Sequence, residues 1–99
     1  MLNINKTIEN GKALFALVGR LDTVTAPELE KELKGSLDGV SELVLDFAGL
    51  EYISSAGLRV LLSAQKTMNG RGGMKVANVN ETIMEIFEIT GFSDFLTIE

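Results

Sequence analysis

Short apolar segments alternate along this chain with longer amphipathic segments, and this alternation limits the folds that the chain can adopt. The order reads strand, strand, helix, strand, helix, strand, helix, strand. Strands separated by a helix usually pair in parallel through a crossover, whereas consecutive strands joined by a tight turn pair antiparallel. We therefore expect an α/β fold with a mixed sheet of about five strands, an opening hairpin followed by parallel crossovers, and three main helices layered on one face.

The expected strands cover residues 2–8, 12–18, 42–47, 74–77 and 95–98. Asn10 and Gly11 form a dipeptide typical of tight turns, so the first two strands are predicted to make a hairpin. Residues 43–45 are apolar on both sides of the chain, which is typical of a strand interior to its sheet. Residues 48–54 are interpreted as an irregular connection to the next helix.

The first helix is expected over residues 26–36, because Thr25, Pro27 and Glu28 together make a capping-box pattern. The second helix is expected over residues 57–68 and ends at the glycine-rich stretch 69–73, which is interpreted as a loop. The third lies between an Asn80 N-cap and Gly91. The apolar stripes of the three helices are Leu29, Leu33 and Leu37; Leu58, Leu61, Leu62, Gln65 and Met68; and Ile83, Met84, Ile86, Phe87 and Ile89.

The length and charge of the chain narrow its class of function. Its 99 residues are read as one domain, 1–99, large enough to fold without disulfides or metal. Nine basic residues are scattered among 14 acidic ones, and the formal charge of −5 argues against direct binding to nucleic acid or to a membrane surface. No segment has the length and apolarity of a signal peptide or a membrane span, so we expect a cytoplasmic protein.

The chain contains no His and no Cys, which removes the commonest general base, the thiol nucleophile and most zinc ligands. A catalytic serine would need an activating base, and Lys66 lies more than two helical turns from Ser55. The Gly-x-Ser-x-Gly pattern of a nucleophile elbow also fails, because Ile53 stands two residues before Ser55. We therefore expect no enzyme activity, no metal and no cofactor.

The segment 52–59 opens the second helix and carries two neighbouring hydroxyl groups, on Ser54 and Ser55. One interpretation is structural, because either serine could cap the helix while Gly57 allows close packing. The other is functional, because the N-terminus of a helix favours an anion and would tolerate a phosphate on an exposed hydroxyl. Phosphorylation there would change a binding surface while leaving the fold intact.

Other polar residues have two readings as well. Asp22 and Asp46 are placed near the ends of apolar strands, where they could form a carboxylate pair or, more commonly, local Asx turns. Asp22 is expected at the same edge of the sheet as Ser55, so the two could share one surface. Arg59 is expected to face solvent on the first turn of the second helix, free to pair with an acidic group of a partner.

Several segments together resemble the STAS family, and within it the free-standing bacterial anti-sigma factor antagonists. Residues 19–22 (Gly-Arg-Leu-Asp) are similar to the family's segment after its second strand, and residues 43–47 to its central strand. Residues 50–58 resemble its signature loop, and residues 86–92 its last helix with the closing glycine. The resemblance covers nearly the whole chain and implies the fold already expected from the alternation of strands and helices.

In the antagonists the signature loop reads Asp-Ser-Ser/Thr-Gly, and the serine after the aspartate is phosphorylated. The matching positions here are Ser54, Ser55, Ala56 and Gly57, so the resemblance implies phosphorylation of Ser55 with Ser54 as second candidate. Ser54 replaces the family's aspartate, Ala56 replaces its second hydroxyl residue, and Arg20 stands where the family usually has an acidic residue. The implied partner-binding residues are Asp22, Ser54, Ser55, Ala56, Gly57 and Arg59.

The mechanism implied by the resemblance is partner switching. The unphosphorylated chain would bind an anti-sigma factor, which is a serine kinase, and so release the sigma factor. Phosphorylation of Ser55 would end the binding, and a phosphatase would restore it. A non-phosphorylated scaffold, such as a subunit of a lipid-transport complex or another regulatory assembly, is the alternative. A monomer is expected, because no long exposed apolar segment demands a second copy.

Overall fold

Helices and strands alternate as the sequence predicts in the computed structural model, which describes residues 2–99. The strands are β1 (Leu2–Glu9), β2 (Lys12–Leu21), β3 (Glu42–Ile53), β4 (Met74–Ala77) and β5 (Thr97–Ile98). The helices are α1 (Ala26–Ser36), α2 (Ser55–Asn69) and α3 (Glu81–Thr90), and a short 3₁₀ turn, η1 (Phe92–Asp94), follows α3.

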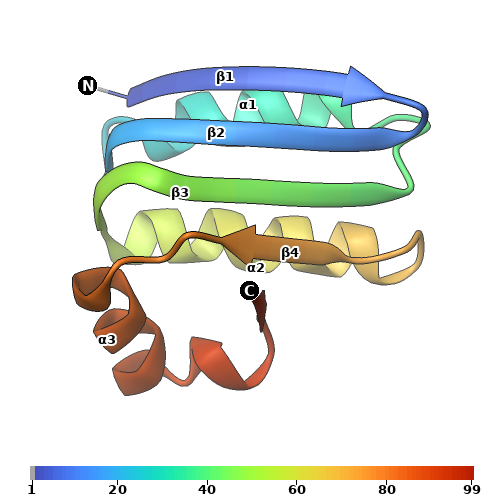
Figure 1. The fold of residues 1–99 in the computed structure, drawn as a ribbon. Coiled ribbons are helices and arrows are strands. Elements are labelled where there is room, and N and C mark those ends of the chain that lie inside the picture. The colour runs from blue at the N-terminus through green and yellow to red at the C-terminus, as the bar shows by residue number, and fades with distance from the viewer. Residues whose placement is uncertain (1) are drawn as a thin grey trace.

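The five strands form one mixed sheet in the order β1-β2-β3-β4-β5 (Figure 1). Strands β1 and β2 pair antiparallel, and each later pair is parallel. The turn between β1 and β2 is made by Asn10 and Gly11, with φ of 53° and 79°, the left-handed conformation that a two-residue hairpin requires. The mixed sheet and the opening hairpin are confirmed.

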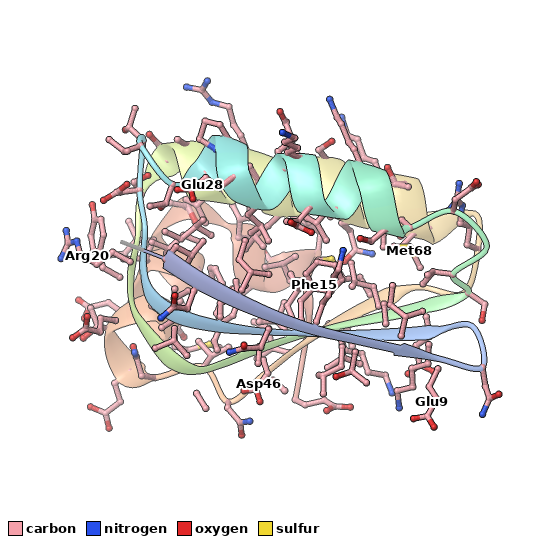
Figure 2. The ribbon with its side chains drawn as sticks, turned by 90° about the horizontal axis from the view of Figure 1, so that it is seen from above. Glu9, Phe15, Arg20, Glu28, Asp46 and Met68 are labelled. Carbon is pink, nitrogen blue, oxygen red and sulfur yellow. The ribbon has the colours of Figure 1, made fainter. Side chains whose placement is uncertain are left out.

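Helices α1 and α2 lie side by side on one face of the sheet, and Phe15 points from β2 into the space between the sheet and these helices (Figure 2). Asp46 points away from the helices, on the opposite face. Helix α3 lies beyond β4 (Figure 1) and packs on the core through Phe87, whose ring centroid is 6.4 Å from that of Phe47. Phe15, Phe47 and Phe87 are all fully buried, so one apolar core joins the sheet to the helices.

Strand β3 is longer than the sequence indicated, because residues 48–53 continue it instead of forming an irregular connection. The pairing of β3 with β2 is irregular along this segment. Its register shifts twice, once between Ala16 and Val18 and once between Gly19 and Arg20. Gly49 lies against β2 there, and a Cβ at this position would come within 2.8 Å of a Val18 methyl group. Pairing resumes after each shift and continues to Leu21 and Ile53, so β2 and β3 end side by side.

Three smaller expectations are wrong. The last strand contains only Thr97 and Ile98, because the preceding residues form η1 and its C-cap Phe95. Ile89 is 76% exposed and does not belong to the buried stripe of α3. Thr25 occupies the N-cap position of α1, but its side chain makes no cap hydrogen bond, so the capping box is not formed. No helix within residues 2–99 is long and apolar enough to span a membrane.

Candidate functional site

The candidate site lies where β2 and β3 end beside each other. Leu21 and Ile53 are paired as the last residues of the two strands, and both are buried. Directly after them, the backbone N–H of Ser54 donates to the Leu21 carbonyl at 2.9 Å. This bond brings the start of α2 next to the loop between β2 and α1, so Asp22 and Ser55 lie at the same edge of the sheet, as expected.

Ser54 and Ser55 have different roles. Ser54 has extended backbone angles and is the N-cap of α2, where its hydroxyl oxygen accepts a 3.5 Å hydrogen bond from the N–H of Gly57. Ser55 is the first residue of the helix and is exposed. No side-chain hydrogen bond within residues 2–99 engages the Ser55 hydroxyl. The helix therefore begins two residues earlier than the sequence indicated, and the cap leaves the second hydroxyl available.

The N-terminus of α2 is electrostatically suited to an anion. The first N–H groups of a helix have no partner within the helix, and the helix dipole adds partial positive charge there. Helices α1 and α3 each carry an acidic side chain in the first turn, Glu28 and Glu81, whereas the first turn of α2 carries none. A negative charge on Ser55 would therefore meet favourable backbone dipoles without a carboxylate in the same turn.

Ala56 and Gly57 fix how closely α2 approaches the sheet. Gly57 is buried, and a Cβ built on it would lie 2.8 Å from side-chain carbons of both Ile53 and Leu21. Ala56 is half-buried against the core. Gly57 thus serves packing, as the structural interpretation of this segment proposed, and that packing seats the first turn of α2 on the ends of β2 and β3.

Asp22 folds the loop that follows β2. Its Oδ1 accepts hydrogen bonds from the N–H groups of Val24 at 3.0 Å and Thr25 at 3.1 Å, which is the Asx turn expected from its position. These bonds, that from the Thr25 N–H most of all, lower the pKa of the Asp22 carboxyl below its ordinary value. The carboxylate is therefore ionised at neutral pH. It stabilises the loop by accepting hydrogen bonds from the backbone of Val24 and Thr25.

Thr25 is a part of the site that the sequence did not reveal. Its hydroxyl donates to the Arg20 carbonyl at 2.8 Å and accepts from the Asp22 N–H at 2.9 Å, and the residue is 3% exposed. The side chain therefore points back toward β2 instead of forward into α1. The pattern of Thr, Pro and Glu resembled a capping box closely enough to hide this role.

Asp46 does not belong to the site. It lies inside β3, paired with Ala16 and Ala77, and six residues of the strand lie between it and the last residue, Ile53. Its Oδ1 accepts hydrogen bonds from the Asn78 side chain and the Ala48 N–H, both at 2.9 Å, and these lower the pKa of the Asp46 carboxyl, with Asn78 as the main cause. A carboxylate pair with Asp22 is therefore wrong, whereas local hydrogen bonding explains both residues.

Arg20 and Tyr52 form a pair that the sequence alone could not place. They face each other across β2 and β3, and the Arg20 guanidinium lies 4.7 Å from the centroid of the Tyr52 ring. The nearest carboxylate is that of Asp22, with 3.9 Å between Arg20 Nε and Oδ2. Figure 2 shows Arg20 projecting from the end of the molecule. The pairing depends on the register shift beside Gly19, for which the sequence offers no signal.

The arrangement offers no route to serine catalysis through the lysine of α2. Lys66 lies eleven residues after Ser55, which corresponds to about 16 Å along a helix. Arg59 is exposed one turn after Ser55, as expected. In the part of the chain that the structure describes, no three carboxylates converge as a metal site would require. The start of α2 therefore presents an exposed hydroxyl on Ser55 and an exposed cation on Arg59.

Comparisons with known proteins agree with this geometry. A family model described as the STAS domain matches residues 3–99. BtrV of Bordetella bronchiseptica, whose name places it among the anti-sigma factor antagonists, is 39% identical over 85 residues, covering 84% of this chain and 73% of the relative. The anti-sigma-B factor antagonist of Bacillus subtilis is 27% identical over 100 residues, covering 98% of this chain and 92% of the relative.

The fold is also shared with solved structures. The crystal structure of an anti-sigma factor antagonist from Mycobacterium paratuberculosis superimposes with a TM-score of 0.89, covering 99% of this chain and 85% of that one. The two sequences are 22% identical, so this likeness concerns the fold. Three helices and a five-stranded mixed sheet are therefore the shared architecture.

Proposed function

Since the chain belongs to the STAS domain family, we propose that it is an anti-sigma factor antagonist, active in the cytoplasm and controlled by phosphorylation of Ser55. In its unphosphorylated form it binds an anti-sigma factor that is also a serine kinase, and the sigma factor is released. The names of the relatives support the class of function, and the geometry around Ser55 supports the control by phosphorylation.

The observation that carries this proposal is that the two neighbouring serines have different structural roles. Ser54 caps α2 through its bond to Gly57, whereas Ser55 is exposed at the first helical position. A kinase can therefore reach the Ser55 hydroxyl without breaking the cap. The free N–H groups of the helix and its dipole would accept the added phosphate, so the modified chain stays folded.

The proposed reaction is an ordinary phosphoryl transfer. The Ser55 oxygen attacks the γ-phosphorus of ATP bound to the kinase, the bond to the β-phosphate oxygen breaks, and ADP leaves. The hydroxyl proton passes to a catalytic base of the kinase. Hydrolysis of the phosphoserine by a separate phosphatase returns the chain to its binding form.

Release of the kinase follows from the charge that the reaction adds. A phosphoserine carries about −1.5 to −2 charges at neutral pH, which takes the formal charge of the chain from −5 to about −7. If Ser55 lies inside the interface, this charge loses its water without gaining a partner, and burial of an unpaired charge strongly opposes binding. Ala56 and Arg59, on the same turn, would share this contact surface, and the buried Gly57 would hold that turn against the sheet.

The experiment that tests the function uses an anti-sigma factor with serine kinase activity from the organism that makes this chain. The wild-type chain is expected to bind the kinase with ADP and to dissociate after incubation with ATP. Ser55→Ala is expected to stay bound in ATP, because no phosphate can be added. Ser55→Asp is expected to bind poorly in either nucleotide while keeping its melting temperature.

The comparison between nucleotides separates switching from scaffolding. A wild-type chain that binds this kinase equally in ADP and ATP, and that gains no phosphate, contradicts the proposal. A stable complex with a transport subunit under those same conditions would instead support the scaffold role.

A further inference from the structure

We propose that Arg20, supported by the Tyr52 ring, is a specificity-determining residue that pairs with a carboxylate side chain of the protein docking at Ser55. This inference rests on the proposed function, since it concerns the surface that the kinase would contact. It adds to that function the chemical identity of one contact, an aspartate or glutamate of the partner.

Arg20 is held in place yet has little bonding of its own. Its side chain is 54% exposed, and its guanidinium lies over the Tyr52 ring at 4.7 Å from the centroid. The one acidic neighbour, Asp22, approaches Nε no closer than 3.9 Å, and no hydrogen bond within residues 2–99 is donated by this guanidinium. Its terminal nitrogens are therefore available to a planar carboxylate, which a guanidinium binds with two parallel hydrogen bonds.

The loop bonds fix the backbone of Arg20, and the Tyr52 ring restrains its side chain. Thr25 Oγ1 donates to the Arg20 carbonyl at 2.8 Å, and Asp22 Oδ1 holds the next turn of the loop. The Tyr52 face limits the guanidinium further through a cation–π contact. Pre-organisation of this kind raises affinity because fewer rotamers are lost on binding.

The position of Arg20 ties it to the Ser55 surface. Arg20 pairs with Tyr52 one step before the paired strand ends, and Ser54 is bonded to the residue after Arg20. Val24, in the same loop, is 79% exposed although its N–H is fixed by Asp22. Arginine and tyrosine, the two residue types that meet here, are among those enriched at interface hot spots.

Several other cations of the chain have closer acceptors than Arg20 has. Lys6 bonds to Glu32 and Ser36, Arg71 donates to the Leu37 carbonyl, and Lys75 lies 3.4 Å from Glu99. These groups lie away from Ser55. Arg20 is therefore a cation that combines exposure, fixed position and nearness to the docking loop.

The test compares the affinity of Arg20 variants for the anti-sigma factor kinase that binds the wild-type chain, in ADP. Arg20→Glu is expected to weaken binding by at least about tenfold, and Arg20→Lys by less, because lysine keeps the charge without the planar fork. Lys12→Glu is the matched control, since Lys12 lies at the other end of the same strand with a side chain 59% exposed. It is expected to bind like the wild type.

Two further readouts separate recognition from a merely structural role. The loss caused by Arg20→Glu should shrink as salt is raised, and replacing one candidate carboxylate of the kinase by lysine should restore binding of that variant. Tyr52 is the one tyrosine of the chain, so a ring-labelled sample gives a single tyrosine spin system, which should shift when unlabelled kinase is added. Tyr52→Phe should bind normally, and Tyr52→Leu should bind like Arg20→Lys.

The outcomes distinguish a failure of the proposed Arg20 contact from a failure of the proposed antagonist function. If Arg20→Glu binds the kinase as tightly as Lys12→Glu while Ser55→Asp does not bind, the function stands and the inference is wrong. If the wild-type chain binds no anti-sigma factor kinase of its organism, both are wrong. A salt-sensitive loss in Arg20→Glu, rescued by the charge change in the kinase, supports both.

Discussion

The backbone N–H of Ser54 donates to the Leu21 carbonyl at 2.9 Å, and this one bond joins the two loops that make the candidate site. It lies just beyond the last paired residues of β2 and β3, so the sheet itself fixes its position. Ser54 also caps α2 with its side chain. The site is therefore assembled from rigid elements, and changes to it should be measurable as changes in stability or in binding, separately.

Gly57→Ala should lower the free energy of unfolding by about 1–3 kcal/mol, because the new Cβ would lie 2.8 Å from carbons of Ile53 and Leu21. Chemical denaturation measures this. Gly35→Ala is the control, since Gly35 is an exposed position in α1 where a Cβ meets nothing within 4 Å. It should stabilise the chain by about 0.5–1 kcal/mol. Equal effects at the two positions would contradict the close approach of α2 to the sheet.

Thr25→Val should cost about 1–2 kcal/mol of unfolding free energy, because the Arg20 carbonyl and the Asp22 N–H lose their partner in a buried place. Thr25→Ser keeps the hydroxyl and should lose less. Thermal melts of the two variants give the comparison. If valine were tolerated better than serine, the hydroxyl would not be holding the loop.

The hydrogen bonds of Asp46 should make the stability of the chain depend on pH in acid. Its folded pKa is lowered from 3.8, chiefly by the Asn78 side chain, so its contribution to stability is present above that ordinary value and is lost as pH falls through the folded pKa. Asn78→Gly keeps the left-handed backbone, which has φ of 58°, and removes the amide donor. The pKa of Asp46 in this variant, followed by NMR of the carboxyl carbon, should rise.

Asp22 serves as the internal control for that titration. Its pKa is lowered mainly by the Thr25 N–H, and Asn78 is not among its partners. The pKa of Asp22 should therefore stay below its ordinary value in Asn78→Gly. A pKa of Asp46 that does not move would show that Asn78 is not its main support.

Replacing the capping serine, Ser54, and replacing the proposed phosphate acceptor, Ser55, should change the free energy of unfolding by different amounts. Ser54→Ala should lower the unfolding free energy by about 1 kcal/mol, because the Gly57 N–H loses its side-chain partner. Ser55→Ala should change it by less than about 0.5 kcal/mol, since that hydroxyl is exposed. Denaturant titration of the two variants, made in parallel, measures both. A larger loss of unfolding free energy in Ser55→Ala than in Ser54→Ala would show that Ser54 is not the residue that caps α2.

The elements that local chemistry determines could be predicted from the sequence. The Asn10-Gly11 turn permits few alternatives to a hairpin, and α1 occupies residues 26–36 as expected. The four-residue spacing of Leu29 and Leu33 sufficed for that, because helix periodicity is a local property. Both leucines are buried in the core.

The features that depend on pairing between distant segments could not be predicted. Residues 48–53 look irregular because Ala48 and Gly49 are poor strand formers, yet the bulge against Val18 keeps them in the sheet. The contact of Arg20 with Tyr52 follows from that register. The sequence showed both serines but not which one caps the helix, because either could satisfy a free N–H group.

The location of the phosphate tests the central claim most directly. The wild-type chain and Ser54→Ala, each incubated with ATP and the anti-sigma factor kinase of the same organism, should gain one phosphate, and fragmentation by mass spectrometry should place it on Ser55 in both. Ser55→Ala should gain none. A phosphate on Ser54, or equal phosphorylation of Ser55→Ala and the wild type, would contradict the assignment of Ser55 as the switch.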